Sequence, residues 1–268
     1  VQEGDCMGCH SIHGGAHPAL VKQAPTSILC FECHDPEIQN HTHLHGPLNQ
    51  GLCEACHNPH QSEHPTLLKR AKPALCFECH EQTGAEFEHN TRHEPFVEDC
   101  ATCHASHGSE IPGLLIEKTP ALCTICHGDL QTLIDTARIP HSPLTEGKNC
   151  MHCHHPHASS HSSLLHSDLV SLCTECHDEE IHTGESVVRN IASRLQEGYF
   201  QHAALQFEGC ITCHQPHASG HTSLLKNRYP PGIYVRGTDD PFALCFDCHD
   251  NALLEEEYTR SATNFRDG

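Results

Sequence analysis

Residues Cys53–His80 read CEACHNPHQSEHPTLLKRAKPALCFECH, and this stretch decides the fold. It holds two copies of the motif Cys-x-x-Cys-His, one at each end. The first copy is followed three residues later by His60 and then by an apolar pair, Leu67 and Leu68. Related stretches begin at Cys6, Cys100, Cys150 and Cys210. The segment is therefore one unit of an internal repeat, because self-similarity at a regular spacing is the signature of repeat architectures.

The motif occurs ten times and uses all 20 cysteines of the 268-residue chain. Alternate motifs start 47, 47, 50 and 60 residues apart, which defines five two-motif units over residues 1–45, 46–93, 94–141, 142–202 and 203–268. The paired cysteines are Cys6 and Cys9, Cys30 and Cys33, Cys53 and Cys56, Cys76 and Cys79, Cys100 and Cys103, Cys123 and Cys126, Cys150 and Cys153, Cys173 and Cys176, Cys210 and Cys213, and Cys245 and Cys248.

This pattern is typical of c-type haem attachment. Residues i, i+3 and i+4 of a helical turn lie side by side, so two thiols can form thioethers with the haem while the next imidazole reaches the iron. A disulfide scaffold, a zinc ribbon and a thioredoxin-like motif all leave the tenfold histidine unexplained. We therefore predict ten covalent haem c groups, whose proximal iron ligands are His10, His34, His57, His80, His104, His127, His154, His177, His214 and His249.

The rest of the composition agrees with a core made of cofactor. The chain has no Trp, 5% aromatic residues and a net charge of −20, which places it near the disordered class. Ten macrocycles would supply the missing apolar surface. We predict a mostly irregular fold of coil and short α-helices with little or no β structure. Pro73, Pro120 and Pro241 should stop longer helices, apolar periodicity predicts a helical insert over 185–205, and residues 226–240 should form an inserted loop.

Charge and hydropathy argue against nucleic-acid binding and against a membrane-spanning segment. Fifteen Lys and Arg against 35 Asp and Glu argue against nucleic-acid binding. No apolar run is long enough for a transmembrane segment, although a membrane protein could still be a partner.

The doubled motifs closely resemble those of the doubled C-x-x-C-H family of multihaem c-type cytochromes, and the resemblance covers essentially the whole chain. It implies haem c, mostly bis-histidine iron and electron transfer. It also implies an extracytoplasmic location, either the periplasm or the cell exterior, because haem attachment in this family takes place outside the cytoplasm.

Of the 30 histidines, 20 are not proximal, and bis-histidine ligation of ten irons needs ten of them. Five recur three residues after a proximal histidine, and four precede the first motif of a unit. These nine predicted distal ligands are His13, His60, His107, His157 and His217, and His45, His93, His141 and His202. The tenth is left open between His17, His43 or His182, a histidine of a neighbouring subunit, and an iron with no sixth ligand.

Methionine cannot be a distal ligand, because Met7 and Met151 lie inside their own motifs. Two imidazoles leave the potential comparatively low. One haem for every 26.8 residues (268/10) cannot be insulated from the next, so the haems should form a continuous redox chain. We expect an electron-transfer protein that is not an enzyme, with redox proteins as partners and a homo-oligomer or filament as its assembly. The alternative is a reductase of nitrite, hydroxylamine or a sulfur oxyanion with one five-coordinate haem.

Overall fold

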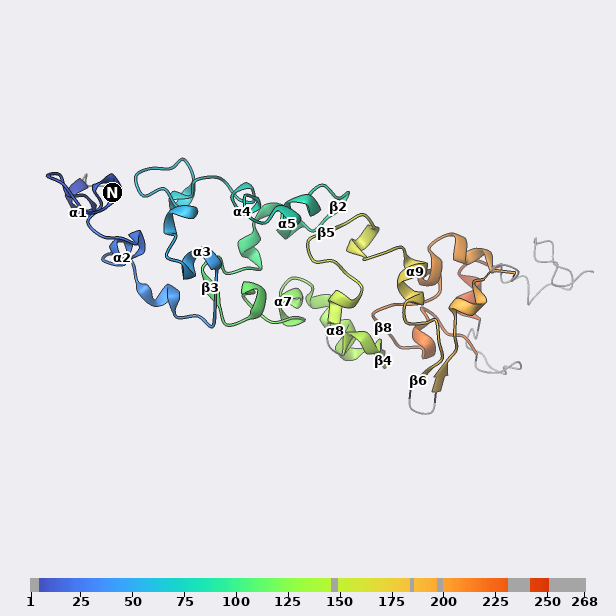
Figure 1. Cartoon of the computed structure of the whole chain (residues 1–268). Helices are drawn as coiled ribbons and strands as arrows, with labels where there is room; N and C mark the ends of the chain where they lie inside the picture. Colours follow the sequence, from blue (N-terminus) through green and yellow to red (C-terminus); the bar gives the residue numbers. More distant parts are fainter. Residues whose placement is uncertain (1–4, 146–148, 184–185, 197–199, 231–241, 251–268) are drawn as a thin grey trace, which may run out of the picture. The chain divides into compact units, whose positions relative to one another are not determined.

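The computed structural model describes residues 5–145, 149–183, 186–196, 200–230 and 242–250. The chain divides into two compact units, Val1–Cys123 with His154–His166 and Thr124–Cys153 with Ser167–Gly268 (Figure 1). Within the described ranges the longest helix has nine residues and every strand has two or three. The predicted fold class is confirmed: the chain is mostly coil with short helices, has only small two-stranded sheets, and is built from five tandem repeats. The residue boundaries of the five repeats stay a prediction.

The α-helices are α1 (Cys6–Cys9), α2 (Thr26–Cys30), α3 (Gly46–Asn49), α4 (Ala74–Phe77), α5 (Glu81–Glu86), α6 (Glu94–Glu98), α7 (Ala121–Thr124), α8 (Gly128–Thr136), α9 (Leu169–Thr174) and α10 (Ala243–Phe246). The strands are β1 (His43–Leu44), β2 (Thr91–Arg92), β3 (Gly108–Ser109), β4 (Ile139–Pro140), β5 (Ala158–Ser159), β6 (Ile181–Thr183), β7 (Ser186–Val188) and β8 (Ala218–Ser219). Short 3₁₀ turns join them.

The haem-attachment motifs lie on single turns of helix. In the second repeat the first motif forms the 3₁₀ turn η3 (Cys53–Ala55), and the second motif lies in and just after α4. Pro73 directly precedes α4 and Pro120 directly precedes α7, as predicted. Proline lacks the amide hydrogen that a longer helix needs. Pro241 lies outside the described residues.

Three two-stranded antiparallel sheets repeat one contact between successive units. The strand before the first motif of one unit pairs with the strand after the first motif of the next, in the pairs β1–β3, β2–β5 and β4–β8. In Figure 1, β2 and β5 lie side by side. The residue after each of these upstream strands is a predicted distal histidine. The backbone amide of this histidine donates to the carbonyl oxygen of the +3 histidine that precedes the paired strand. The N···O distance is 2.9 Å from His45 to His107 and 2.9 Å from His93 to His157.

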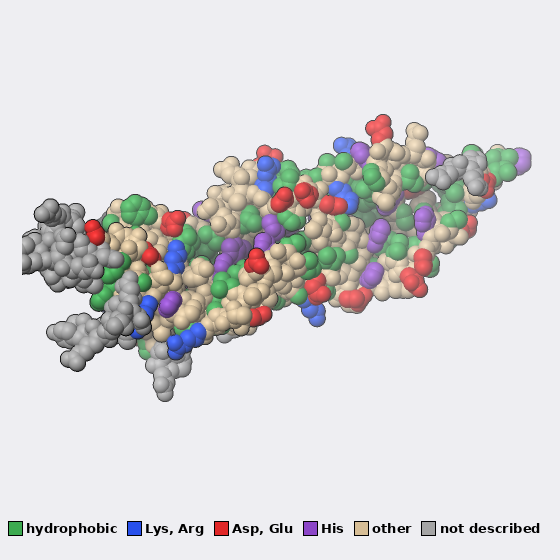
Figure 2. Space-filling view, turned by 180° about the vertical axis from the view of Figure 1, so that it is seen from behind, with side chains coloured by type: hydrophobic (Ala, Val, Ile, Leu, Met, Phe, Trp, Pro, Cys, Tyr) green, Lys and Arg blue, Asp and Glu red, His purple; other side chains and the backbone are tan. Residues whose placement is uncertain are grey.

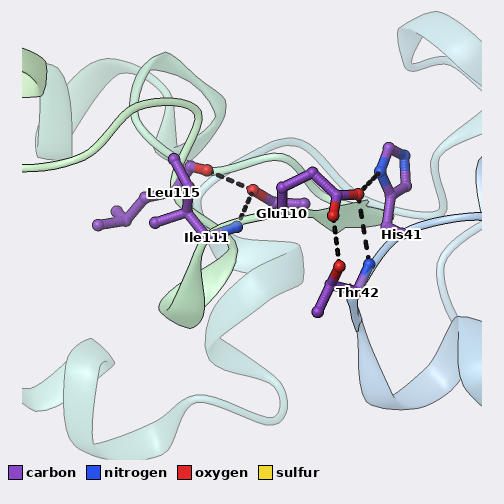
Figure 3. A network of polar contacts seen from close by, with 6 residues as sticks. His41, Thr42, Glu110, Ile111 and Leu115 are labelled. Atoms are coloured by element: carbon purple, nitrogen blue, oxygen red, sulfur yellow. Dashed lines mark hydrogen bonds and ion pairs between the residues drawn. The ribbon is translucent and has the colours of Figure 1, made fainter.

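A return loop follows the first motif of every unit and runs from its proximal histidine to the residue 11 positions later. A β-bridge closes each loop, as between His104 and Leu115. Ser109 fixes the third of these loops from inside, since its hydroxyl donates to the Leu115 carbonyl at 2.5 Å and accepts from the Ile111 amide at 3.0 Å (Figure 3). Hydrogen bonds to backbone groups, and not an apolar core, therefore hold the loop in place.

The polypeptide buries few apolar side chains. Within the described ranges the buried apolar residues are Leu48, Phe96, Ala158, Leu165, Ala204 and Ala218, and the two most deeply buried of them are alanines, Ala158 and Ala218. Large apolar side chains such as Phe207 and Ile125 are 81% and 65% exposed. Figure 2 shows histidine and hydrophobic side chains interleaved at the surface. This agrees with a composition too poor in large apolar residues to build a core alone.

The helical insert predicted over 185–205 is wrong in its described part. Residues Ser186–Val188 form β7 and pair with β6, while Ala192–Arg194 form the 3₁₀ turn η10. The β-branched pair Val187 and Val188 favours an extended strand over a helix, and Ile181 lies across the hairpin from Val188. Apolar spacing alone did not reveal this partner strand. The loop predicted over 226–240 lies largely outside the described residues.

Candidate haem sites

Within the described residues, six pairs of imidazole rings that join one motif histidine to one histidine predicted as a distal ligand have their centroids 5.9 to 6.3 Å apart. The pairs are His10 with His60, His45 with His80, His57 with His107, His104 with His157, His141 with His177, and His202 with His249. The structure therefore brings together residues that are far apart in the sequence but share one predicted role.

This separation fits one metal ion held between two imidazoles. Two metal–nitrogen bonds of about 2 Å, with about 1.1 Å from each nitrogen to its ring centre, place two ring centroids roughly 6 Å apart. Three of the pairs are close to parallel, with interplanar angles of 16° to 19°. Two imidazoles are the donor set that low-spin bis-histidine haem iron takes.

The pairs follow two rules. The proximal histidine of a first motif pairs with the +3 histidine of the next unit, as His57 does with His107. The proximal histidine of a second motif pairs with the histidine that precedes the first motif of its unit, as His80 does with His45. The roles that the sequence predicts for His93, His127, His154 and His217 stay predictions.

Three other candidate ligands, His13, His34 and His214, are in no such ring pair within the described part of the chain. His13 is the +3 histidine of the first unit, His34 belongs to the second motif of that unit, and His214 belongs to the first motif of the fifth unit.

The proximal histidines of the first motifs are oriented by the backbone. The Nδ1 atom lies 2.8 to 2.9 Å from the carbonyl oxygen of the residue nine positions later in all five units. A carbonyl oxygen only accepts hydrogen bonds, so Nδ1–H is the donor and Nε2 keeps its lone pair for a metal. The acceptors belong to Ala19, Thr66, Gly113, Ser163 and Ser223.

Sequence reasoning missed these acceptor residues, although the repeat carries a signal for them. All five adopt positive φ, from 53° at Ser163 to 74° at Gly113. A non-glycine residue in this region costs about 1 kcal/mol or more and persists where the surroundings require it. The turn directs its carbonyl oxygen at the histidine ring, so the strained conformation orients that ring. The repeated Leu-Leu pair after this residue was the available marker.

The distal histidines are oriented in a similar way. His45 Nδ1 lies 3.0 Å from the Ser106 carbonyl, and His93 Nδ1 lies 2.9 Å from that of Pro156. Pro216 supplies the same kind of backbone hydrogen bond to His141. Burial lowers the pKa of the axial candidates His107, His141, His157 and His177. These rings are therefore kept neutral at physiological pH, the state in which imidazole can bind iron.

The motif cysteines are free of disulfides, and some thiols of successive motifs form hydrogen bonds with each other. A hydrogen bond with Cys100 and burial raise the pKa of Cys76 far above its ordinary value, while the same bond lowers the pKa of Cys100 to about 7. Cys173 and Cys210 form an equivalent pair. Attachment points of the fourth and fifth motifs, and of the eighth and ninth, are thus adjacent.

The three extra candidates for the tenth ligand are not placed opposite a motif histidine in the described residues. His17 precedes the turn η1 (Pro18–Leu20), and the same repeat position carries His64, His161 and His221 in three other units and Ile111 in one. His43 lies in β1 and pairs with Ser109, where the equivalent strands carry Thr91 and Ile139. His182 lies in β6. The source of the tenth distal ligand stays a prediction.

A family model described as the doubled CXXCH motif matches the chain five times, at residues 1–39, 45–85, 93–132, 141–182 and 202–253. The matches cover most of the sequence and follow the five two-motif units. No curated protein matches the chain significantly. Within the described residues, every helix is too short or too polar to cross a membrane.

Proposed function

This chain belongs to the doubled CXXCH family of multihaem c-type cytochromes, which act in electron transfer outside the cytoplasm, and we propose that it holds ten haems as one continuous redox wire. The single observation that carries the proposal is the set of six imidazole pairs at 5.9 to 6.3 Å. Haem c, when attached, supplies a one-electron Fe(III)/Fe(II) couple. The polypeptide sets the spacing of the haems, their axial ligands and the local dielectric.

We assign six axial pairs, which are the ring pairs described above. In the first-motif pairs the distal ligand comes from the next unit, so these haems are shared between repeats. Each such haem then cross-links two units, which couples folding of the chain to haem attachment.

Two imidazoles on each iron favour electron transfer over substrate chemistry. An iron with both axial positions filled has no site for a substrate, and both ring orientations are held through Nδ1 hydrogen bonds. The adjacent cysteines of successive motifs, as in Cys76 with Cys100, bring haem edges close together. Close edges support electron passage from one centre to the next. The acidic surface, with a net charge of −20 before haem propionates are counted, favours a redox partner with a basic docking face.

The haems of His34 and His214 have no assigned distal ligand under these rules. An open iron at either one would allow the reductase alternative. For the His214 haem we propose instead that His13 of a second copy is the distal ligand, because His13 is of the +3 type that a first-motif haem takes in this repeat. Such a contact is heterologous and propagates head to tail, so it would build a filament.

The proposed function is tested by haem stoichiometry and coordination state. A haemochrome assay against protein mass should give ten haems per chain. Cyanide and nitric oxide added to the oxidised and reduced protein should bind few irons or none. Turnover of nitrite or hydroxylamine at an iron that also binds cyanide would favour the reductase instead.

A further inference from the structure

One axial histidine has a carboxylate as its Nδ1 partner. His157 Nδ1 lies 3.0 Å from Oε2 of Glu86, the last residue of α5. The opposite partner of His157 is the motif histidine His104, with ring centroids 6.2 Å apart. Glu86 therefore stands directly behind one ligand of the fifth haem, in the outer shell that tunes a metal site.

Other axial histidines have neutral acceptors. The Nδ1 atoms of the five first-motif proximal histidines and of His45 and His93 all lie against backbone carbonyl oxygens. The sequence shows the same contrast. The residue seven positions before the upstream histidine His93 is Glu86, whereas the residue at this offset from the other three upstream histidines is aliphatic. Those aliphatic residues are Ile38, Ile134 and Leu195. The carboxylate is thus a departure from the repeat at one position.

The surroundings strengthen this contact. The side chains of Glu86 and His157 are 27% and 30% exposed, and the ring of the buried Phe96 stacks on His157 at 4.9 Å between centroids. A hydrogen bond to a charged acceptor in a partly apolar setting is stronger than one in water. His155 is the next nearest base, with Nε2 3.9 Å from Glu86 Oε1.

These three residues do not form a separate cation site in the haem-loaded protein. Their ligand atoms lie within 4.8 Å of one another. However, a His157 ring that gives Nε2 to iron carries its proton on Nδ1, so it has no second lone pair. The geometry leaves Glu86 the role of hydrogen-bond acceptor.

We propose that Glu86 is a positioning residue that lowers the reduction potential of the haem held by His104 and His157. By accepting the Nδ1 proton in a charged hydrogen bond, the carboxylate increases the electron density of the His157 ring and stabilises Fe(III) relative to Fe(II). The fifth haem is then a low-potential step in the wire. This inference rests on the axial pair assigned under the proposed function.

The test uses the full haem-loaded protein with Glu86→Gln and Glu86→Ile. At a fixed ambient potential on the slope of its titration, the Fe(II)/Fe(III) ratio of one haem in ten should rise about tenfold, equal to about 59 mV for a one-electron couple. One low-spin EPR component should change its g values at the same time. Glu86→Asp, which keeps the charge, should restore part of the shift.

The matched control is Glu110→Gln. Glu110 also accepts from a histidine, since its Oε1 lies 3.2 Å from His41 Nδ1, and it contacts Thr42 as well (Figure 3). His41 is not an axial candidate, so this variant should leave all ten potentials unchanged.

Two results would overturn the inference, and a third variant tells them apart. His157→Met should convert one haem to histidine–methionine ligation with a higher potential. If His157→Met acts on one haem and both Glu86 variants shift nothing, the tuning role of Glu86 is wrong while the axial pair stands. If His157→Met changes no haem, the axial pair itself is wrong and the inference falls with it.

Discussion

The imidazole rings of His104 and His157 lie with their centroids 6.2 Å apart, although they belong to consecutive repeat units. The same relationship joins His10 to His60 and His57 to His107. Under the proposed ligation a single unit would not complete its own first haem site, because the unit that follows would supply the distal ligand. Ligation would then hold the repeat together along with packing.

Removing one distal histidine should open one iron. In His60→Ala the haem of His10 loses its partner, so one haem in ten should become high-spin and bind cyanide. The measurement is EPR spin quantitation with a cyanide titration. His64→Ala is the control, because this residue lies in the same loop and uses its backbone amide to bind Ser62 Oγ at 2.9 Å. An unchanged number of open irons in His60→Ala would contradict the observed pair.

The positive-φ position of the return loop should respond oppositely to two exchanges. Gly113→Ala should lower the free energy of unfolding by about 1 kcal/mol, and Thr66→Gly should raise it by a similar amount. The reason is that a side chain costs energy at φ 74° or 56° even where no atom clashes. Gly113 has open space around a new Cβ, with Leu115 Cγ nearest at 3.9 Å. Thermal or denaturant unfolding of the haem-loaded variants measures both changes, and two changes of equal sign would refute the explanation.

The haem-free chain should not fold. Six small buried apolar side chains in the described ranges cannot offset the conformational entropy of a domain of this size. Expression without haem attachment should give a chain with no cooperative transition in calorimetry and no fixed tertiary signal in near-ultraviolet circular dichroism. The haem-loaded protein under the same conditions is the control. A cooperative transition in the haem-free chain would show that the polypeptide builds a core of its own.

Assembly and ligation should be coupled through His13. His13→Ala should both shift sedimentation toward the monomer and add one cyanide-binding iron per chain, because the proposed ligand of a neighbour's His214 haem is lost. His17→Ala, four residues away, should change neither. A protein that stays monomeric at high concentration with ten six-coordinate irons would rule out this contact.

The sequence predicts the composition of the sites well and their connections poorly. Motif chemistry identifies His57 and His107 as ligands, because each lies at a fixed offset from a cysteine pair. It does not show that the two share one iron, since that contact depends on how β1 pairs with β3 across units. Glu86 was missed for a similar reason, because its partner His157 is 71 positions away. The helix expected near Val187 does not form, because this residue lies in β7 and pairs with β6, a strand that the apolar spacing did not reveal.

The most direct test of the account is low-temperature EPR of the fully oxidised protein, with spin quantitation before and after cyanide. We predict low-spin bis-imidazole signals that cyanide leaves unchanged for at least six irons per chain, those of the observed ring pairs. Five or more irons that are high-spin or bind cyanide would contradict the axial pairing on which the wire depends.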